Sequence, residues 1–379
     1  MANFFDWLEK DLGRFEIDLP EMPFEFALGW LGYIGYEMKG DCGAGNIHLS
    51  PYPDTVMVFC DRGIVIDHQE KQIHLLALAR TDDQAESKKW IDDTSIFLSD
   101  ILRPHQNEPA NFPESLSLET PFILRHDKKK YIELIKKSQE YIRQGETYEV
   151  CLTNMATARS GAAYLQLKDI CILSCSPERF LAISDNRIAE SKPIKGTRGR
   201  SNDPLEDKKL YEELVASEKE NAENLMIVDL VRHDLGKTAE LDSVEVPKLF
   251  AIESYQTVHQ MVSTIRSTIR ENASPCQCIR DAFPGGSMTG APKLRTMQIL
   301  DVLEEGARGI YSGAIGYFSL SGAVDLSIVI RTLIMSQGEL SFGIGGAITA
   351  LSDPEEEFEE IRVKAKAFLD LFNTDFSGY

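Results

Sequence analysis

The sequence predicts an α+β fold built mainly from antiparallel sheets. Along its 379 residues, strand-like and helix-like segments come in groups and do not alternate strictly. Strict alternation would indicate a doubly wound parallel sheet, whereas grouped elements indicate an α+β architecture. Hydrophobic residues make up 43% and charged residues 26% of the chain. This is an ordinary globular balance, with material for one large core or two smaller ones.

The first third of the chain is expected to be rich in strands. Residues 26–38 place three glycines among aromatic side chains, which indicates strands that approach each other closely. Residues 55–78 predict three short strands separated by polar turns, and a helix is expected near residues 83–101. Residues 105–121 are polar and contain prolines, which predicts a connection on the surface.

These patterns suggest a division of the chain into three parts. Residues 1–104 form a β-rich part, residues 105–121 the connection, and residues 122–379 the part that carries the chemistry. The connection alone does not establish two domains, because it could equally be a surface loop. We expect the first and last parts to form one integrated domain.

The pattern changes after Lys128, where helices become prominent. A helix from Lys128 is expected to end near Gly145, because glycine commonly follows the last helical turn. Residues 204–237 predict one long helix. The other expected elements are a strand near 147–154, two strands within 169–190, strands near 309–320, 324–335 and 339–350, and a final helix from Asp353.

The charge and cysteine content exclude several classes of protein. A formal net charge of -20 argues against nucleic acid or an anionic membrane surface as a partner. The start of the chain lacks the layout of a signal peptide, and no apolar run is long enough to span a membrane. The seven cysteines are scattered without a CxxC pair, which predicts reduced thiols and a cytoplasmic location. An anionic substrate would need local cations, backbone N–H groups or a metal.

Lys195, in the segment SKPIKGTRGR, is the first candidate for chemistry. It follows an apolar residue and precedes Gly196, so that the backbone can turn sharply after the ammonium. A lysine that acts as a nucleophile must lose its proton, and burial in an apolar pocket lowers the pKa to allow this. A lysine in such a basic loop is more often solvated, so the segment alone does not show whether Lys195 is a nucleophile.

Two pairs of glutamates recur at a spacing of three residues, Glu220 with Glu223 and Glu357 with Glu360. Residues three apart share a helix face, so that each helix can present two carboxylates to one point. Two such faces would suit Mg²⁺, which binds carboxylates and retains waters. The second pair also fits the start of a helix capped by Asp353, and spacing alone favours that interpretation.

Further candidates lie near the end of the chain. The glycines within residues 341–349 could present backbone N–H groups to a carboxylate, although a β-bulge explains them equally well. Arg331 ends an apolar strand and must meet an anion or reach solvent. Lys364 lies one turn after Glu360, where it could form a salt bridge or bind a second carboxylate.

Together these segments resemble the chorismate-utilising enzyme family, which includes anthranilate synthase component I, aminodeoxychorismate synthase component I, isochorismate synthase and salicylate synthase. The matching stretches run in family order from about Gly29 to Leu369. They are GWLGYIGYE, GETYEVCLTN, SPERF, PIKGTRGR, AENLMIVDLVRHDLG, FPGGSMTGAPKLRTMQILDVLE, RGIYSGAIGYF, VDLSIVIRTL and GIGGAITALSDPEEEFEEIRVKAKA. The resemblance implies large antiparallel sheets packed face to face, with flanking helices.

Two positions indicate the branch of the family. Lys195 in PIKGT is typical of the aminodeoxychorismate synthase branch, whereas anthranilate synthases carry alanine there. Branches that add water carry lysine at the position of Glu149. The resemblance therefore implies component I of aminodeoxychorismate synthase, which converts chorismate and ammonia to 4-amino-4-deoxychorismate in p-aminobenzoate and folate biosynthesis.

The resemblance also implies residue roles. Lys195 would add at C2 of chorismate, and Glu178 would protonate the departing C4 hydroxyl. Mg²⁺ would be held by four glutamates, the first two directly and the others through water: Glu223, Glu360, Glu220 and Glu357. The residues expected to bind the substrate are Gly196, Thr197, His259, Tyr311, Arg331, Gly345, Gly346, Ala347 and Lys364.

The ammonia would come from a glutamine amidotransferase, either a separate subunit or a fused domain. Two alternatives remain at this point, of which the second belongs to another class of protein. One is an anthranilate synthase component I-like enzyme, and the other is an inactive homologue that only binds a glutaminase. The presence of Glu178, Lys195, Glu223 and Glu360 weighs against the inactive homologue.

The sequence departs from the family pattern in three places. Residues 155–167 directly join two strands between which relatives have a helical segment with an NPxPY motif. Because that segment lines a tryptophan pocket in relatives, its loss puts tryptophan binding in doubt. The chain also begins without the first strands of the family and their LLES-type motif. Finally, Ala347 stands where relatives have glycine.

Overall fold

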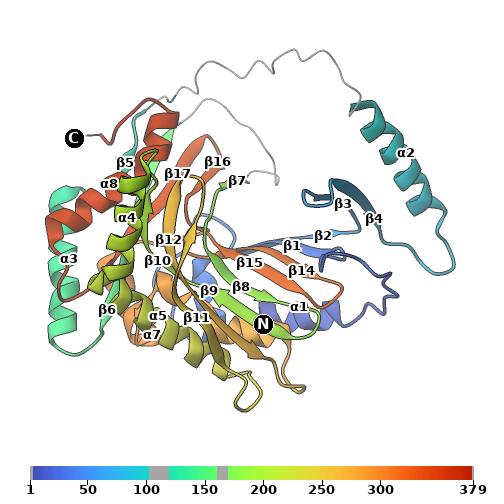
Figure 1. Cartoon of the computed structure of the whole chain (residues 1–379), viewed down its shortest axis with the longest axis horizontal. Coiled ribbons are helices and arrows are strands. Elements are labelled where there is room, and N and C mark those ends of the chain that lie inside the picture. The colour runs from blue at the N-terminus through green and yellow to red at the C-terminus, as the bar shows by residue number, and fades with distance from the viewer. Residues whose placement is uncertain (1–2, 102–117, 119, 160–169, 378–379) are drawn as a thin grey trace.

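The computed structural model describes residues 3–101, 118, 120–159 and 170–377, which form two large antiparallel sheets with helices packed on them (Figure 1). The helices of the described chain are α1 (Phe4–Leu12), α2 (Ala85–Ile101), α3 (Lys128–Arg143), α4 (Pro204–Ala216), α5 (Glu218–Gly236), α6 (Pro275–Ala282), α7 (Lys293–Leu303) and α8 (Pro354–Leu371), with 3-10 helices η1 (Tyr36–Cys42) and η2 (Gly286–Met288). None of the helices in these ranges is at once long and apolar enough to span a bilayer.

The first sheet has nine strands in the order β10-β12-β9-β8-β15-β14-β1-β2, with β11 also beside β12. Its strands are β1 (Gly29–Ile34), β2 (Thr55–Cys60), β8 (Arg179–Ile183), β9 (Ile188–Lys192), β10 (Ile194–Gly199), β11 (Glu245–Ser254), β12 (Val258–Thr268), β14 (Ala314–Ser319) and β15 (Val324–Ile328). Strand β1 pairs with β14, so the N-terminal strands belong to the same sheet as strands from the end of the chain.

The second sheet has six strands in the order β13-β6-β17-β16-β7, with β5 beside β6. Its strands are β5 (Ile123–Leu124), β6 (Glu149–Arg159), β7 (Ile170–Ser174), β13 (Gly290–Ala291), β16 (Thr332–Ser336) and β17 (Glu339–Ile348). A separate hairpin of β3 (Arg62–Asp67) and β4 (Gln72–Ala77) lies with α2 at one end of the molecule (Figure 1). Among the described residues, all pairings between the named strands are antiparallel, as the grouped elements predict.

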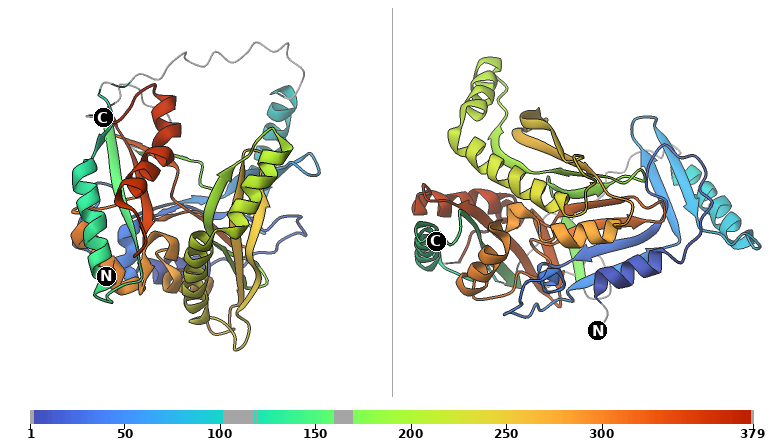
Figure 2. Two further views of the ribbon diagram at one scale, coloured as in Figure 1. Left: turned by 60° about the vertical axis from the view of Figure 1, so that its left-hand side comes forward. Right: turned by 90° about the horizontal axis from the view of Figure 1, so that it is seen from below.

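Each sheet has its own hydrophobic core. Residues of β8, β15 and β14 pack with α1, α5 and α6 in one core, while β6 and β17 pack with α3, α7 and α8 in the other. Helices α3 and α8 lie on one side of the molecule and α4 and α5 on the other (Figure 2). A small apolar cluster that includes Tyr33 from β1 and Ile334 from β16 joins the two sheets.

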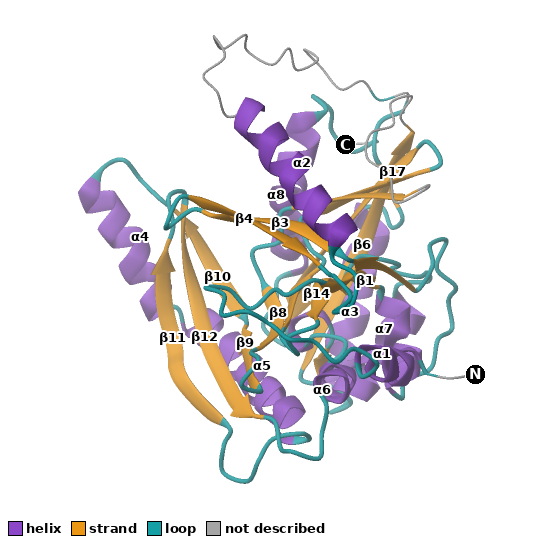
Figure 3. Cartoon of the chain, turned by 90° about the vertical axis from the view of Figure 1, so that its right-hand side faces the viewer, coloured by secondary structure: helices purple, strands orange, loops and turns teal. Residues whose placement is uncertain are grey.

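The glycines near the N-terminus allow a close approach of strands, as predicted. A Cβ on Gly32 would lie 1.9 Å from the Val56 carbonyl oxygen, because β1 is held between β2 and β14. The strand ends at Ile34, however, and η1 follows. Helices α1 and α6 lie together along the lower part of the molecule (Figure 3), where Arg280 pairs with Asp6 at 3.2 Å.

Three expectations about elements were wrong. Residues 204–237 form two helices because Ser217 has extended backbone angles and caps α5, its side chain accepting from the Glu220 N–H. Residues 169–190 contain parts of three strands, β7, β8 and β9, instead of two strands. Residues 324–335 do not form one strand, because Arg331 has a φ of 50° between β15 in the first sheet and β16 in the second.

Other expectations about elements were confirmed or cannot be tested. The helix after Lys128 ends as expected, with Gly145 at a φ of 76° just beyond its C-cap residue Gln144. Of the predicted connection 105–121, only residues 118, 120 and 121 lie within the described residues. The short junction expected within residues 155–167 also lies outside the described residues from position 160 onward.

A buried ion pair between Arg308 and Glu304 ties the second sheet to the loops beside it. The Arg308 guanidinium donates to both carboxylate oxygens of Glu304 at 2.7 and 2.8 Å and to the carbonyls of Met288 and Cys151. Glu304 also accepts from the N–H and hydroxyl of Thr153. Both charged side chains are almost completely buried, so neither can be solvated if the other is removed.

We expect Glu304→Ala to lower the free energy of unfolding by about 3–5 kcal/mol, because it leaves the Arg308 charge buried without a partner. Lys366→Ala is the matched control, since Lys366 forms an exposed i,i+4 pair with Asp370 at 2.8 Å. The loss of this pair should lower the free energy of unfolding by about 0.5 kcal/mol or less. Denaturant unfolding of both variants tests this, and equal losses would contradict the structural role of the buried pair.

Candidate active site

A cavity of about 570 Å³ lies between the two sheets. This volume suits a small metabolite, since ligand sites commonly span about 300–1,000 Å³. Most residues singled out in the sequence line its wall: Glu178, Lys195, Gly196, Thr197, Glu220, Glu223, Tyr311, Arg331, Gly345, Gly346, Ala347, Glu360 and Lys364. They come from β10 and the β15–β16 link of the first sheet, from β17 of the second, and from helices α5 and α8.

Strand β10 brings Lys195 to the cavity at an irregularity in its pairing. The register of β10 with β12 shifts between Ile194 and Thr197. Gly196 has a φ of 84°, and a Cβ there would lie 2.8 Å from the side chain of Leu214 and 3.0 Å from that of Glu220. Glycine is therefore required directly after Lys195, because the turn needs positive φ and α4 and α5 pack closely against it.

The Lys195 ammonium is held by acidic groups. Its Nζ atom lies 2.9 Å from Oε1 of Glu149 and 3.9 Å from Oε2 of Glu223. Burial lowers the pKa of Lys195, but the charges of Glu149 and Glu223 and the hydrogen bond to Glu149 outweigh burial and raise it above its ordinary value. The expectation of a lowered pKa was therefore wrong, because the sequence did not reveal these two partners.

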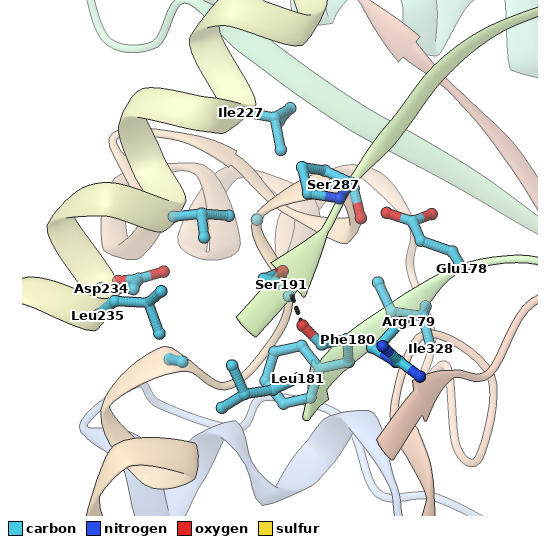
Figure 4. Close-up of a pocket in the computed structure, with 15 residues that line it drawn as sticks. Glu178, Arg179, Phe180, Leu181, Ser191, Ile227, Asp234, Leu235, Ser287 and Ile328 are labelled. Carbon is cyan, nitrogen blue, oxygen red and sulfur yellow. Dashed lines mark hydrogen bonds between the residues drawn. The ribbon is translucent and has the colours of Figure 1, made fainter. Parts of the chain in front are cut away.

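Glu178 lies at the end of the loop before β8, with only 6% of its surface exposed. Burial raises the pKa of Glu178 to about 7, although hydrogen bonds from the Ser287 hydroxyl and the Ile194 N–H and the nearby charge of Lys195 act in the opposite direction. Figure 4 shows the Glu178 carboxylate facing Ser287. A carboxyl group with this pKa can hold a proton near neutral pH and deliver it to a leaving group.

Behind Glu178 lies a second, much smaller cavity of about 20 Å³ (Figure 4). It is bounded mainly by apolar side chains such as Phe180, Leu181 and Ile227. The volume is sufficient for one water-sized molecule. Glu178 thus lies at the wall between the large cavity and an apolar pocket, which accounts for its desolvation.

The predicted carboxylate pairs come together on α5 and α8. Glu223 and Glu360 line the cavity, and the buried Glu357 accepts from Ser352 at 2.7 Å. The ammonium of Lys219 bridges the helices, at 3.4 Å from Glu357 and 4.0 Å from Glu223. Burial raises the pKa of Glu223 to about 7 despite the charge of Lys195. In the described chain, no group of three or more His, Cys, Asp or Glu side chains has a metal-binding arrangement.

The helix-start interpretation of the Glu357 and Glu360 segment is confirmed, and the magnesium interpretation stays a prediction. Asp353 caps α8 by accepting from the N–H groups of Glu355 and Glu356. Glu357 is buried, whereas Glu360 lines the cavity with 45% of its side chain exposed. The helix cap therefore explains the first acidic residues of α8 but not the burial of Glu357.

The glycine run in β17 is not a β-bulge, because its pairing with β6 continues without a shift from Glu339 to Ile348. Strand β16 pairs with β17 only over residues 339–341. Beyond that point one backbone edge of β17 is free of strand pairing within the described sheet, and Lys364 donates to the Gly345 carbonyl at 2.7 Å. Lys364 also pairs with Glu360 at 2.6 Å, as the i,i+4 spacing allows.

Two expected residues do not reach the cavity wall. His259 faces α4, where its Nε2 atom lies 3.2 Å from Asp207 and its ring packs edge-on against Tyr211. Its Nδ1 atom pairs with the Ser254 hydroxyl at 2.7 Å. Neighbouring side chains of a strand point to opposite faces, so Gln260 lines the cavity in its place. Glu357 lies behind the wall, in contact with Lys219.

Sequence reasoning missed three residues that shape the site. Glu149 was considered only as a position lacking lysine, yet it is the closest partner of Lys195. Ser287 and Lys219 were not singled out at all. The available signal for Lys219 was its place one residue before Glu220, on the helix that carries the first glutamate pair.

A desolvated carboxylic acid, a buried lysine and several carboxylates around one cavity are a combination typical of enzyme active sites. The chain belongs to the chorismate-binding enzyme family, whose model matches residues 2–370 under the description "chorismate binding enzyme". The fold is also that of a solved anthranilate synthase component I from Streptococcus pneumoniae, with a TM-score of 0.80 and 27% identity over 96% of this chain and 84% of that one.

Curated relatives agree with this family. The aminodeoxychorismate synthase of Streptomyces griseus is 52% identical over 100% of this chain and 54% of its own length. The aminodeoxychorismate synthase component 1 of Salmonella typhimurium is 36% identical over 92% of this chain and 77% of its own length. The chain thus spans about half the length of the Streptomyces relative.

The raised pKa of Glu178 predicts a pH-dependent contribution to stability. The unfolded chain releases this proton near pH 4.5, whereas the folded protein retains it to about pH 7. Between these values the folded state binds more protons, so the contribution of Glu178 to stability falls as the pH rises through this window. Its total size is on the order of 3 kcal/mol.

Glu178→Gln should remove this loss of stability with rising pH, because the amide stays neutral. The measurement is the difference in free energy of unfolding between wild type and variant, from denaturant unfolding at several pH values. We expect the variant to gain stability relative to wild type between pH 4.5 and 7. A difference that does not vary with pH would contradict the assignment.

Proposed function

We propose that this chain carries the chorismate-amination activity of an aminodeoxychorismate synthase, converting chorismate and ammonia to 4-amino-4-deoxychorismate. The observation that carries the proposal is the presence of Lys195 and Glu178 on the wall of one cavity. The names of the relatives at 52% and 36% identity support the same activity. The product would serve p-aminobenzoate and folate biosynthesis.

The proposed reaction divides one displacement into two steps. The Lys195 amine adds to C2 of chorismate, the ring double bonds shift, and the C4 hydroxyl leaves as water with a proton from Glu178. Ammonia then adds at C4, the double bonds shift back, and the amine of Lys195 departs. Covalent catalysis of this kind replaces one difficult step with two easier ones.

The substrate is anionic, so positive and N–H groups around the cavity would hold its carboxylates. Arg331 and Lys364 supply the cationic side chains, and the free edge of β17 near Gly345 supplies backbone groups. Thr197 and Tyr311 offer hydroxyls on the same wall. Since these groups come from both sheets, a bound dicarboxylate would contact both halves of the site.

The carboxylates of α5 and α8 fit a magnesium ion. Oε1 of Glu223 is buried and has no hydrogen-bond partner among the described residues, and the Lys219 ammonium already lies between Glu223 and Glu357. A buried carboxylate oxygen that lacks a hydrogen bond could bind a metal ion, which would take the place of the Lys219 ammonium. Glu223 and Glu360 would bind the metal directly, with Glu220 and Glu357 assisting through water. When bound, the metal would neutralise a carboxylate of the substrate.

The ammonia would be supplied by a glutamine amidotransferase, since "component 1" in the name of the Salmonella relative implies a second component. All seven cysteines are unpaired, which supports a cytoplasmic setting. The structural match to an anthranilate synthase component I favours one rival activity. Incubation with chorismate, Mg²⁺ and ammonium separates the two, because anthranilate as the main product would exclude our proposal.

Lys195→Ala tests the covalent step directly. With chorismate and Mg²⁺ but no ammonia, intact-mass spectrometry of the parent protein should show an adduct with the mass of chorismate less one water. Lys195→Ala should show none. Lys192→Ala is the matched control, because Lys192, at the end of the preceding strand β9, pairs with Glu253 and does not line the cavity. Equal labelling of the Lys195 variant would place the nucleophile elsewhere.

Glu360→Gln tests the metal site. Titration calorimetry with Mg²⁺ should show a loss of affinity of at least about tenfold, because mutations around a metal site commonly cost that much. Glu359→Gln is the control, since the adjacent Glu359 is exposed and pairs with Arg362 at 3.6 Å. The same Mg²⁺ affinity in both variants would remove Glu360 from the site.

A further inference from the structure

The closest contact of Lys195 crosses from one sheet to the other. Lys195 lies on β10 of the first sheet, whereas Glu149 is the first residue of β6 in the second. Lys195 Nζ donates to Glu149 Oε1 at 2.9 Å. The side chain of Lys195 is 11% exposed and that of Glu149 1% exposed, so the contact is shielded from bulk water.

An ammonium group has no free electron pair, so Lys195 must lose a proton before its nitrogen can bond to carbon. Two carboxylates lie near its Nζ atom. Glu149 is within hydrogen-bonding distance, whereas the nearest oxygen of Glu223 is 3.9 Å away. Proton transfer requires a hydrogen-bonded acceptor, and among the described residues Glu149 is the carboxylate that meets this condition.

The second oxygen of Glu149 shows that this carboxylate is not fixed by a structural network. Its Oε2 atom is buried and has no hydrogen-bond partner among the described side chains and backbone. Glu304, the structural carboxylate of the same sheet, differs because Arg308 and Thr153 occupy both of its oxygens. Glu149 can therefore take up a proton without breaking a contact other than the one to Lys195.

We propose that Glu149 is the positioning residue that holds Lys195, accepts its proton when the amine bonds to the substrate, and returns that proton when the amine departs. This inference rests on the proposed function. As the bond between Nζ and C2 forms, one proton moves from Lys195 to Glu149. As the bond between C4 and oxygen breaks, one proton moves from Glu178 to the leaving hydroxyl.

Charge is balanced across this step. Before it, Lys195 is positive, Glu149 is negative and Glu178 is neutral. After it, the substituted amine is positive, Glu149 is neutral and Glu178 is negative. In the second step ammonia bonds to C4, and the electron pair of the breaking bond returns to Nζ. Glu149 gives its proton back to Lys195, and the new ammonium at C4 gives one to Glu178.

Glu149→Gln tests this inference, because the amide keeps the size and the accepting oxygen but cannot take a proton. The adduct rate with chorismate and Mg²⁺, without ammonia, is followed by quenched-flow intact-mass spectrometry of the full chain. We expect a fall of about 100-fold or more, the usual contribution of a general base. The Kd for chorismate should stay within about threefold, since Glu149 does not line the cavity. Adduct formation at the wild-type rate would overturn the inference.

Two further variants make the test decisive. Glu146→Gln is the control, since Glu146 forms a half-exposed pair with Arg295 at 2.7 Å, and it should leave the adduct rate unchanged. Glu149→Asp retains a carboxylate, so it should form the adduct faster than Glu149→Gln, even if the glutamine variant is poorly folded. An aspartate variant that is no faster would count against proton transfer. If wild type forms no adduct, the proposed function itself fails, which is a different result.

Discussion

The ion pair between Lys195 and Glu149 is the contact on which the organisation of the site depends. It joins β10 of one sheet to β6 of the other at the cavity wall. Both side chains are largely buried, at 11% and 1% exposed, so each charge is stabilised by the other. Because the two sheets have separate cores, this pair and the small cluster around Tyr33 fix how their inner faces meet at the substrate site.

Around this pair, an acidic protein places several cationic side chains on one cavity wall. The chain has a formal net charge of -20, yet the cavity wall carries Lys195, Lys219, Arg331 and Lys364. Each of the three lysines lies beside a glutamate, so the site is a mixed array in which positive and negative charges are close neighbours. Such an array can bind both a carboxylate and a cation. A bound carboxylate would replace a glutamate beside a lysine, and a bound cation would replace a lysine beside a glutamate.

The sequence predicted the fold class and most elements, and most of the predicted site residues line the cavity. It could do so because hydrophobic periodicity, helix caps and glycines act locally. The family motifs also include β10 and β17, two strands that line the cavity. The errors concern contacts between distant segments. His259 turned out to face α4 because strand alternation points it away from the cavity, and the break at Ser217 depends on a single capping side chain. The capping pattern at Ser217 and Glu220 was a local signal for the break that was overlooked, whereas which face of β12 meets the cavity depends on how the sheets pack.

The predicted lowering of the Lys195 pKa is the most instructive of these errors. Burial alone would lower the pKa of Lys195, and the charges of Glu149 and Glu223, both distant in the sequence, reverse the sign of the shift. A protonated lysine has no free electron pair and is not a nucleophile. Under the proposed mechanism, Lys195 must therefore pass its proton to an acceptor that contacts it. The structure that raises the pKa thus also supplies the acceptor, because the carboxylate that stabilises the ammonium is the one placed to deprotonate it.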